Sequence, residues 1–439
     1  MYKEEQPLIF IFITLSVIMN IFAFWMNINV FFQIFISFFG FSKNTLDYKM
    51  HDPKLRFLVL VPAHNEADVI DGIISNMNKM DYPKELYDFY ILADNCTDNT
   101  AEIAEKAGAK VLTFFKENEN DPTGKSIVLK KAFEALPDYA EKYDAVFFFD
   151  ADNWADYAMF SEVNSQFLDA SDNTEIIQCY LGSKNKKGLV AFFYYCSYTI
   201  SNRFLQYSRQ RLGINCGIGG TGFAVRTRYL KQRGGWSSES LTEDTELQIA
   251  ATLEGKRILW NNHVRVYDEK PITWKASYRQ RVRWAKGHWY IAIKNTSKVI
   301  KALFSRKIPV KEGISMLVQL YFPATYLLAI IYIIFTITTT LLSQQIYPSS
   351  TVDPYAYLIP NAYGILLFIY MIIVQFSVGE LQDNKQKVNP LIWPFLLLSF
   401  VLNSLLASVA QIVGLFTYKN QHSWDKTEHF SHVSDVSLK

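Results

Sequence analysis

Long apolar segments at both ends of the chain limit its possible folds more than any other feature of the sequence. Leu8 to Phe41 is an almost uninterrupted apolar and aromatic run, longer than the roughly 20 residues that cross a bilayer. It has no small-residue cleavage site of the kind that ends a signal peptide, so we expect it to remain as an anchor. After Gly313, three segments are each long enough to span: Ile314 to Leu342, Tyr355 to Val378 and Leu391 to Tyr418. The sequence therefore predicts membrane helices on both sides of a more polar domain.

The first apolar run contains four polar side chains: Asn20, Asn27, Asn29 and Gln33. These fit one long tilted helix with a polar seam, or one span followed by a segment in the membrane interface. One span is the favoured interpretation.

The distribution of basic residues predicts which side of the membrane the polar domain occupies. Phe304 to Lys311 and Asp383 to Lys387 are rich in Lys and Arg, whereas Ser343 to Pro354 contains neither. Cytoplasmic loops are enriched in basic residues, so we expect the first two segments and the polar domain in the cytosol, beneath the plasma membrane. Three C-terminal spans would then leave the tail, Lys419 to Lys439, outside.

Composition excludes several classes of function. A mean hydropathy of +0.02 with 15% aromatic residues is too apolar for an ordinary soluble enzyme of 439 residues. The formal net charge of +2, without a long run of like charge, argues against nucleic acid as a partner and favours metabolites and the lipid bilayer. The four cysteines show neither C-x-x-C spacing nor a paired framework, which fits a reducing, cytosolic compartment.

Short apolar strands alternate with helical patterns in the polar domain. The first unit is the strand Phe57 to Val61 with a helix from Ala67 to Met80, and the second is the strand Phe89 to Ala93 with a helix that Asn99 and Glu102 cap. Further strands are expected at Lys110 to Phe115, Ala145 to Phe149, Glu175 to Tyr180, Phe223 to Val225, Arg257 to Asn261 and Val266 to Pro271, and a helix at Ser126 to Ala135. This order predicts an α/β fold with a mostly parallel, Rossmann-like sheet, in which ligands bind at the carboxyl ends of strands.

Acidic side chains follow two of the expected strands. Asp94 is placed to accept hydrogen bonds from a base or ribose, although loop aspartates also cap helices. The fourth strand ends in Asp150-Ala151-Asp152, and two such carboxylates suit Mg²⁺ or Mn²⁺, with phosphate oxygens and water completing the shell. Lys125, at the start of a helix, is either a phosphate ligand or an ordinary solvated lysine.

Two stretches have both a structural and a functional interpretation. Leu189 to Leu212 alternates aromatic residues with Arg203, Arg209 and Arg211 at helical spacing, which is typical of a helix in the membrane interface or of a core helix of the α/β domain. Gly217 to Gly222 is either a tight turn or a place where backbone comes close to a ligand.

The most informative stretch lies just before the C-terminal apolar region. Thr242-Glu243-Asp244 opens an expected helix at Thr245 to Glu254, so these residues either cap that helix or supply an acid for chemistry. Gln280-Arg281-Val282-Arg283-Trp284 follows, and Gln-x-x-Arg-Trp is expected by chance only roughly 0.01 times in a chain of this length. Taken singly, Arg281 and Arg283 also fit side chains that reach toward the membrane interface. Together, the two motifs indicate an acid beside a clamp for a diphosphate.

In this order, the motifs resemble those of the membrane-integrated family 2 glycosyltransferases, the group that contains cellulose, hyaluronan, chitin-type and poly-N-acetylglucosamine synthases. The resemblance covers Leu55 to Trp289 and the arrangement of flanking helices. It is carried by Val61-Pro62-Ala63-His64-Asn65-Glu66, Asp94, Asp150-Ala151-Asp152, Gly220-Thr221-Gly222, Thr242-Glu243-Asp244 and Gln280-x-x-Arg283-Trp284. It implies a cytosolic GT-A domain at residues 51–300, flanked by an N-terminal membrane anchor and linker at 1–50 and a C-terminal membrane region and tail at 301–439, with interfacial helices.

The resemblance also implies an inverting hexosyltransferase that polymerises a β-linked polysaccharide from a UDP-sugar, with UDP-glucose the first expectation and UDP-N-acetylglucosamine the second. Asp244 is expected to be the base, grouped with Glu243 and Thr242, and burial beside Glu243 is expected to raise its pKa. The residues expected to hold the donor are Pro62, Ala63, Glu66, Asp94, Lys125, Asp150, Gln280, Arg283 and Trp284. Those expected to hold Mg²⁺ or Mn²⁺ are Asp152 and Asp150, and those expected to contact the acceptor are Gly220, Thr221, Gly222 and Trp284.

By the same resemblance, the helices after Gly313 form a channel that extrudes the growing glycan, with accessory secretion or modifying subunits as further partners. The tail residues Trp424 to His429 are similar to segments that some of these synthases place over the bound nucleotide. Such a gate conflicts with a tail outside the cell, unless one C-terminal apolar segment is re-entrant. The chain departs from many relatives in having Asn95 after Asp94, where they have a second Asp.

Three other functions fit parts of the sequence. A non-processive transferase that adds one sugar to a lipid, in glycolipid synthesis, is similar around the same motifs and differs in product length. A transporter or receptor with an α/β sensing domain is expected to place ionisable residues inside its spans, and here they lie near the span ends. An inactive paralogue is disfavoured, because each position that the chemistry needs holds a competent residue.

Overall fold

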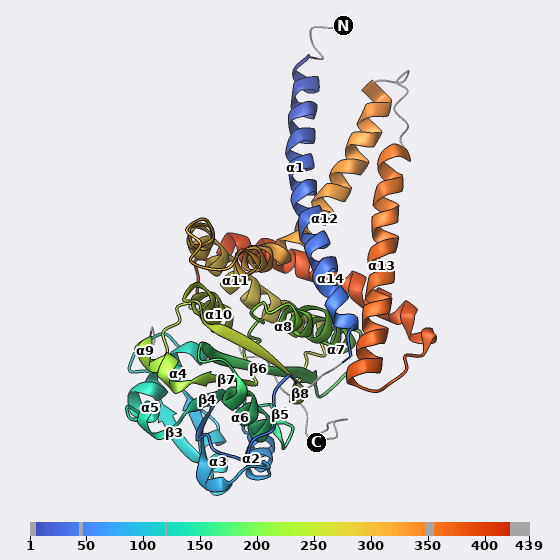
Figure 1. The fold of residues 1–439 in the computed structure, drawn as a ribbon. Helices are drawn as coiled ribbons and strands as arrows, with labels where there is room; N and C mark the ends of the chain where they lie inside the picture. Colours follow the sequence, from blue (N-terminus) through green and yellow to red (C-terminus); the bar gives the residue numbers. More distant parts are fainter. Residues whose placement is uncertain (1–5, 44–46, 119–120, 347–354, 422–439) are drawn as a thin grey trace.

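The computed structural model describes residues 6–43, 47–118, 121–346 and 355–421 (Figure 1). Within them, one eight-stranded sheet has the order β3-β2-β1-β4-β7-β6-β8-β5. The strands are β1 Phe57–Ala63, β2 Tyr87–Asp94, β3 Lys110–Phe114, β4 Ala145–Phe148, β5 Trp154–Ala155, β6 Thr174–Ser183, β7 Phe223–Arg226 and β8 Arg257–Asp268. β1 to β4 are parallel to one another, as are β6 and β8, whereas β7 runs antiparallel to both of its neighbours. Because β7 is reversed, the glycine-rich loop before it lies at the edge where β4 ends.

Helices cover both faces of this sheet. They are α2 Ile70–Asn78, α3 Thr100–Lys106, α4 Lys125–Ala135, α5 Tyr139–Lys142, α6 Met159–Asp169, α9 Thr227–Gln232 and α10 Glu243–Leu253, with a 3₁₀ turn at Lys84–Leu86. One apolar cluster includes residues of α2 and α6, and a second includes residues of α4 and α9. Alternate residues of β1 enter each cluster, with Phe57, Val59 and Val61 in the first and Leu58 and Leu60 in the second. β1 is therefore buried on both faces, as its continuous apolar sequence predicts.

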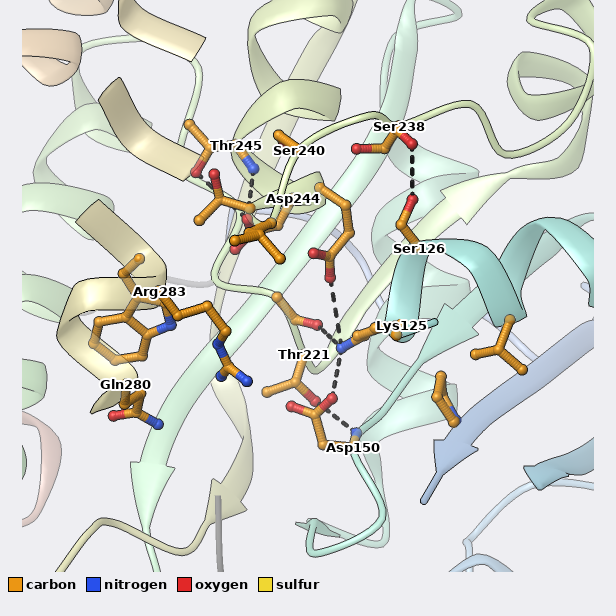
Figure 2. A pocket seen from close by; sticks show the side chains of 18 of the residues that line it. Lys125, Ser126, Asp150, Thr221, Ser238, Ser240, Asp244, Thr245, Gln280 and Arg283 are labelled. Atoms are coloured by element: carbon orange, nitrogen blue, oxygen red, sulfur yellow. Dashed lines mark hydrogen bonds and ion pairs between the residues drawn. The ribbon is translucent and has the colours of Figure 1, made fainter. Parts of the chain in front are cut away.

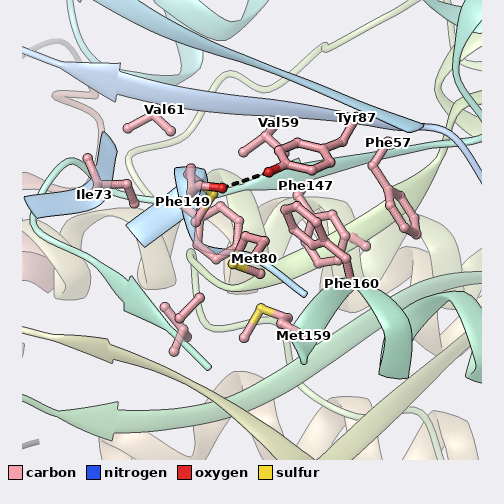
Figure 3. Close-up of a cluster of buried hydrophobic side chains, with 14 of the residues drawn as sticks. Phe57, Val59, Val61, Ile73, Met80, Tyr87, Phe147, Phe149, Met159 and Phe160 are labelled. Atoms are coloured by element: carbon pink, nitrogen blue, oxygen red, sulfur yellow. Dashed lines mark hydrogen bonds between the residues drawn. The ribbon is translucent and has the colours of Figure 1, made fainter. Parts of the chain in front are cut away.

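The first cluster is built around aromatic side chains (Figure 3). Phe57 and Phe147, from neighbouring strands, have ring centroids 5.1 Å apart, and Phe160 of α6 lies 5.6 Å and 4.9 Å from them. Burying one such side chain contributes about 1.5–3 kcal/mol. This packing holds in place the strands whose carboxyl ends carry the polar motifs.

Most expected strands and helices of the α/β domain form close to their expected bounds, and two details differ. The strands expected at 257–261 and 266–271 are one strand, β8, whose register against β6 is irregular. α3 begins at Thr100 as expected, but the Asn99 side chain makes no capping bond. Asp98 takes its place, because its carboxylate accepts a hydrogen bond from the backbone N of Thr100 at 3.0 Å.

A bent helix joins the sheet to the long helices at the chain ends. α7 Leu189–Ser201 continues through a π-helical turn, Asn202–Tyr207, into α8 Ser208–Arg211, and α7 packs against α13 and α14. Of the two interpretations of this stretch, the core helix fits Arg203 and Arg209, since Arg203 is fully buried and Arg209 is 3% exposed. These arginines make contacts inside the protein instead of reaching toward lipid headgroups.

All four apolar segments of the sequence are helical where the structure describes them. The long helices are α1 Gln6–Ser37 with a 3₁₀ turn at Phe38–Phe41, α11 Trp274–Phe304, α12 Val310–Ile346, α13 Tyr355–Asp383, and α14 Trp393–Thr417 after a 3₁₀ turn at Pro390–Ile392. Among the described residues, two stretches are long and apolar enough to cross a membrane, Ser16–Phe41 and Pro390–Thr417. These two candidate helices are compatible with membrane association.

α14 does not lie alongside α12 and α13 (Figure 1). In Figure 1, α1, α12 and α13 extend away from the sheet together, whereas α14 runs across their lower ends and contacts α7, α11 and α12. After α14, Gln421 Oε1 accepts a hydrogen bond from the backbone N of Leu241, just before α10, at 2.8 Å. The described start of the tail therefore lies beside the α/β domain, and not on the opposite side of the long helices from it as expected. The tail motif Trp424 to His429 lies outside the described residues.

Candidate active site

A cavity of about 700 Å³ opens at the sheet edge where the polar motifs meet (Figure 2). The ends of β1, β2 and β4, the loop before β7, the first turns of α4 and α10, and one side of α11 form its wall. The expected site residues that line it are Pro62, Ala63, Glu66, Asp94, Lys125, Asp150, Asp152, Gly220, Thr221, Thr242, Glu243, Asp244, Gln280, Arg283 and Trp284. The fold thus gathers motifs that lie far apart in the sequence.

Lys125 links three parts of the cavity wall. Its Nζ donates to Asp150 Oδ1 at 2.5 Å and to the Gly220 carbonyl at 2.6 Å, and Glu243 Oε1 lies 3.9 Å away. Burial lowers the pKa of Lys125, but the carboxylates of Asp150 and Glu243 raise it, and the net shift is upward. The Lys125 ammonium group is therefore fixed by hydrogen bonds at the start of α4, and Lys125 is not an ordinary solvated lysine. It is placed to contact an anionic group.

Two carboxylates follow β4 in different surroundings. The Asp150 side chain is 42% exposed, and its backbone N donates to Asn153 Oδ1 at 2.9 Å and to Thr221 Oγ1 at 3.1 Å. Asp152 is buried, and its Oδ2 accepts a hydrogen bond from the backbone N of Glu269 at 2.7 Å. The exposed carboxylate therefore faces the cavity while the buried one is held by backbone.

These carboxylates can be compared with the needs of a divalent cation. In the described part of the chain, no three or more His, Cys, Asp or Glu side chains are grouped to enclose a metal ion. A hard cation such as Mg²⁺ usually takes one or two carboxylates and keeps water and substrate phosphate oxygens as its other ligands. The pair Asp150 and Asp152, in a cavity with room for a diphosphate, fits that mode of binding.

Asp94 lines the cavity at the end of β2. It is 6% exposed, its Oδ2 accepts from the backbone N of Gly124 at 3.3 Å, and its Oδ1 accepts from the Asn95 side chain at 2.6 Å. Burial raises the pKa of Asp94. The hydrogen bond from the Asn95 side chain therefore holds the Asp94 carboxylate in place.

α10 begins in the cavity wall with two neighbouring carboxylates. Thr242 precedes the helix, but its side chain makes no capping bond, so the capping interpretation is wrong for Thr242. Asp244 Oδ1 accepts from the backbone N of Thr245 at 2.7 Å. Burial raises the pKa of Glu243 to about 7, with Lys125 opposing and Asp244 adding to that shift, and burial also raises the pKa of Asp244. A carboxylate of this kind is able to accept a proton near neutral pH.

The glycine-rich loop comes close to Asp244. Gly220 has a φ of +81°, and a Cβ at this position would lie 3.2 Å from Asp244 Oδ2, so both backbone and space favour glycine. The Thr221 hydroxyl donates to Asn153 Oδ1 and so supports the backbone around Asp150. Thr221 lines the cavity with its hydroxyl already engaged.

Gly222 was expected to contact the acceptor, but it does not line the cavity. Its backbone N donates to the Phe148 carbonyl at 2.8 Å, and a Cβ at this position would overlap the Val266 side chain. Gly222 therefore allows the loop before β7 to pack closely against Val266 of β8.

The Gln-x-x-Arg-Trp motif lies on the cavity side of α11, since positions i, i+3 and i+4 share one face of a helix. Arg283 points toward Lys125 in Figure 2, across the open part of the cavity. Arg281 faces elsewhere, with its guanidinium 4.9 Å from the ring centroid of Tyr194. Of the two arginines, Arg283 alone lines the cavity.

Several lining residues were not expected from the sequence: Tyr198, Asp268, His288, Pro323, Gln411 and Gln421. Asp268, at the end of β8, has an Oδ1 that lies 2.6 Å from Lys270 Nζ, and burial together with the charge of Asp152 raises the pKa of Asp268 to about 6 against the effect of Lys270. An acid at a strand end was a usable signal for Asp268. The others come from α7, α11, α12, α14 and the segment after it, and no local pattern marks them.

The sheet order and the carboxylates at its edge define a GT-A-like α/β fold of the kind found in glycosyltransferases. The structure is similar to that of mannosyltransferase PcManGT from Pyrobaculum calidifontis, solved in complex with GDP-Man and Mn²⁺, with a TM-score of 0.56 at 14% identity. The similarity covers 83% of this chain and 98% of that one. Residues 53–287, more than half of the chain, match the family described as glycosyltransferase like family 2. The chain belongs to this family.

Curated relatives extend the similarity beyond the α/β domain. Probable glycosyltransferase YdaM of Bacillus subtilis (strain 168) is 25% identical over 412 residues, which cover 90% of this chain and 92% of that protein. Glucomannan 4-beta-mannosyltransferase 7 of Arabidopsis thaliana is 22% identical over 87% of this chain and 66% of that protein. Beta-monoglucosyldiacylglycerol synthase of a Nostoc species is 28% identical over 249 residues. These residues cover 54% of this chain and 51% of that protein, so the match spans about half of the relative.

Proposed function

We propose that this chain is an inverting hexosyltransferase that extends a β-linked polysaccharide from a UDP-sugar, with Mg²⁺ or Mn²⁺, and passes it across the plasma membrane. The observation that supports this most is one cavity that holds the carboxylate of Asp244 opposite the cations Lys125 and Arg283. UDP-glucose is the first choice of donor and UDP-N-acetylglucosamine the second. In this proposal residues 51–300 are the cytosolic catalytic domain, and residues 1–50 and 301–439 hold it in a multi-pass arrangement.

The donor lies across the strand ends. Its base and ribose contact the β1 and β2 side of the cavity, which is lined by Pro62, Ala63, Glu66 and Asp94. Its diphosphate lies beside Lys125 and Arg283, whose positive charges favour bound phosphate. Asp150 and Asp152 would hold a divalent cation, which would neutralise part of the diphosphate charge when it is bound. The complex of PcManGT with GDP-Man and Mn²⁺ supports this assignment by analogy of fold.

Asp244 is the base in this proposal. The acceptor hydroxyl oxygen attacks C1 of the donor sugar while its proton passes to the Asp244 carboxylate, and the bond from C1 to the diphosphate oxygen breaks. UDP leaves with the electron pair, and attack opposite the leaving group inverts C1. Lys125 and Arg283 stabilise the charge that develops on UDP, so that no side chain has to protonate the leaving group.

The acceptor is a glycan in the favoured form of the proposal. Trp284 offers an aromatic face for a sugar ring, and the cavity reaches Pro323 of α12 and Gln411 of α14, toward the helices at the chain ends. The name of the Arabidopsis relative describes transfer to a polysaccharide. The alternative is transfer of one sugar to a lipid, and the name of the Nostoc relative describes a glycolipid product.

Product analysis tests the proposal. The purified protein in nanodiscs is incubated with each radiolabelled UDP-sugar, and with GDP-mannose, in Mg²⁺ or Mn²⁺, beside the Asp244→Asn variant. We expect one donor to give a high-molecular-weight product that one linkage-specific glycosidase digests, and about 10²–10⁴-fold less of it from Asp244→Asn. A small product extracted by organic solvent would establish the glycolipid alternative. Equal turnover by Asp244→Asn would remove Asp244 as the base.

A further inference from the structure

Residues 215–222, which include the glycine-rich loop before β7, run along one face of α10. Asn215 Nδ2 donates to Thr252 Oγ1 at 3.0 Å, and the backbone N of Ile218 donates to Gln248 Oε1 at 3.3 Å. Gln248 and Thr252 are four residues apart, so they lie one above the other on the helix, and both are buried. These contacts fix the spacing of the two segments, because a shift would leave buried donors and acceptors unpaired.

The same face of α10 continues to the cavity. Asp244 is one turn before Gln248, and a Cβ at Gly220 would lie 3.2 Å from Asp244 Oδ2. The Gly220 carbonyl also accepts the hydrogen bond from Lys125. The contact of Gln248 with Ile218 therefore determines how the proposed base meets both the loop and the cation that the loop binds.

Gln248 is itself held by a side chain of α12. Its Nε2 donates to Gln319 Oε1 at 2.8 Å, and Gln319 Nε2 donates back to Gln248 Oε1 at 2.9 Å. Arg209 Nη1 donates to the same Gln319 Oε1 at 3.2 Å. An arginine and a backbone N–H can only donate, so the donors at the two ends of this chain of bonds fix the orientation of both amides. Gln319 therefore matches Gln248 in the direction of its hydrogen bonds as well as in distance.

The amide pair lies beside an apolar cluster that joins α10, α11 and α12. The residues that follow the two glutamines, Ile249 and Leu320, are both buried members of this cluster. Hydrogen bonds are stronger in such surroundings than in water, and an unpaired amide is costly there. Two turns earlier on α12, Glu312 Oε1 accepts a hydrogen bond from the backbone N of Asn215 at 3.0 Å. α12 thus holds both α10 and the segment that packs on it.

We propose that Gln319 is a positioning residue for the transfer reaction, which acts through Gln248 to hold Asp244 beside Gly220. The inference rests on the proposed function and adds α12 to the elements that build its site. Gln319 does not line the cavity, so it is not a ligand of the donor or the acceptor there. Its effect on the reaction passes through the alignment of α10 with the glycine-rich loop.

Two substitutions of Gln319 separate positioning from stability. Gln319→Met keeps the approximate volume of the side chain and removes both amide hydrogen bonds. Gln319→Glu keeps an oxygen for Gln248 Nε2 and brings a negative charge to the buried Arg209, but it cannot donate to Gln248 Oε1. The control is Tyr321→Phe, which removes the 2.8 Å hydrogen bond between α12 and Thr296 of α11 and leaves the amide pair intact.

We expect kcat to fall about tenfold in Gln319→Met while the donor KM stays within about twofold, because a small misplacement of the base slows the chemical step more than it weakens donor binding. Gln319→Glu should lose a similar part of kcat although its thermal midpoint is equal to or above that of the wild type, since the carboxylate pairs with Arg209. Tyr321→Phe should lower the thermal midpoint and keep kcat. If kcat followed the thermal midpoint across these variants, the positioning role would be overturned.

A double-variant cycle tests whether the effect of Gln319 passes through Gln248. Gln248→Met should lower kcat at least as much as Gln319→Met does. The double variant should lose no more kcat than Gln248→Met alone, because residues that act as one unit are not additive. A further loss of about tenfold in the double variant would mean that Gln319 acts by another route, and the proposed link would be wrong.

Hydrogen exchange of the protein in nanodiscs requires no turnover and separates this inference from the proposed function. We expect faster amide exchange in peptides covering residues 215–222 and 243–253 in Gln319→Met and Gln319→Glu, and wild-type exchange there in Tyr321→Phe. Faster exchange without turnover of any donor would support the link from α12 to the site and count against the proposed function alone. Wild-type exchange in both substitutions of Gln319, or faster exchange with wild-type kcat, would refute the positioning role.

Discussion

At the residue scale, the carboxylates at the start of α10 predict the pH dependence of the reaction. Burial raises the pKa of Glu243 to about 7, with Asp244 adding to the shift, and it also raises the pKa of Asp244. A base works only when it is deprotonated, so we expect kcat to fall as the pH drops through this region, by about tenfold per pH unit at the acid end. The two groups titrate together, and the kinetic profile reports the pair.

Substituting Glu243→Gln tests this coupling. The variant has no negative charge at position 243, so ionisation of Asp244 meets less repulsion and its pKa falls. The acid side of the pH–kcat profile is therefore expected to move to lower pH, while Asp244→Asn shows almost no activity at any pH. A profile for Glu243→Gln that lies at or above the wild-type position would contradict the assignment of Asp244 as the titrating base.

Lys125 supplies a second prediction at this scale. Its Nζ neutralises Asp150 and meets the Gly220 carbonyl, in the place assigned to the donor diphosphate. Hydrogen bonds to charged groups contribute about 1.5–3 kcal/mol, so Lys125→Met should raise the donor KM by roughly tenfold to a hundredfold. The control is Lys130→Met, an exposed lysine of the same helix, with an unchanged KM. An unaffected donor KM in Lys125→Met would remove Lys125 from the donor site.

The charged members of the site could be predicted from the sequence better than the neutral ones. Asp94 ends β2 and Asp150 follows closely after β4, and the edge of a parallel sheet brings such positions together whatever lies between them. Tyr198 and Gln411 reach the same cavity from helices whose placement depends on contacts between distant segments. No local pattern separates Gln411 from any other polar residue on an apolar helix.

At the element scale, the contact between α10 and α11 is controlled by one glycine. A Cβ at Gly287 would lie 2.5 Å from Thr242 Oγ1 and 2.9 Å from the Thr242 backbone N. Gly287→Ala should therefore force the start of α10 away from α11, with about 1–3 kcal/mol of strain, partly offset by the roughly 1 kcal/mol better helix propensity of alanine. Because Asp244 lies in the first turn of α10, we expect at least a tenfold loss of kcat, on the order of what small misplacement of a catalytic group produces.

Gly313→Ala is the matched control for this prediction. It places the same methyl group in another long helix, where the nearest atom is the far end of the flexible Leu303 side chain at 2.8 Å. We expect it to keep kcat and to gain or lose little stability in thermal unfolding. If both variants had wild-type kcat, the spacing of α10 and α11 would not govern the position of Asp244.

Elements with continuous apolar sequences could be predicted, and those with mixed sequences could not. β1 and β4 are buried on both faces, so their sequences show it directly. α6 was missed because its buried side includes Asn164, Ser165 and Gln166, which bind backbone and side-chain groups of other segments and dilute the helical apolar pattern. The burial of Arg203 in the π-helical turn was missed for a similar reason, since charge normally indicates a surface position.

At the scale of the whole molecule, the α/β domain and the long helices are joined by polar contacts. Arg203 Nε donates to the Gly40 carbonyl at 2.7 Å, its Nη1 donates to Asp383 at 2.6 Å, and its Nη2 donates to the Ser42 carbonyl. One buried guanidinium thus ties the end of α1, the helix α7–α8 and the end of α13 together. The sequence could not show this, because its partners lie more than 160 positions away, with separations of 163, 180 and 161 residues.

Breaking this buried pair on one side should be far more harmful than removing both charges. Arg203→Met leaves the Asp383 carboxylate buried beside an apolar group, so we expect the free energy of unfolding to fall by about 3–5 kcal/mol, measured by thermal unfolding in detergent. The double variant Arg203→Met with Asp383→Leu should recover much of that loss, since well-packed apolar side chains can replace a buried ion pair.

The surface pair Arg211 and Asp47, 3.3 Å apart, is the control, and Arg211→Met should change stability by less than about 1 kcal/mol. If Arg203→Met were as harmless as Arg211→Met, the junction between the sheet and the long helices would have to rest on the apolar packing of α7 against α13 and α14. Activity measured on the stable double variant separates an effect of these charges on the product from an effect on the chemistry. In the proposed reaction, full kcat with shortened glycan chains would mean that the charges hold the end of α13 in place for the product and do not affect the chemistry at Asp244.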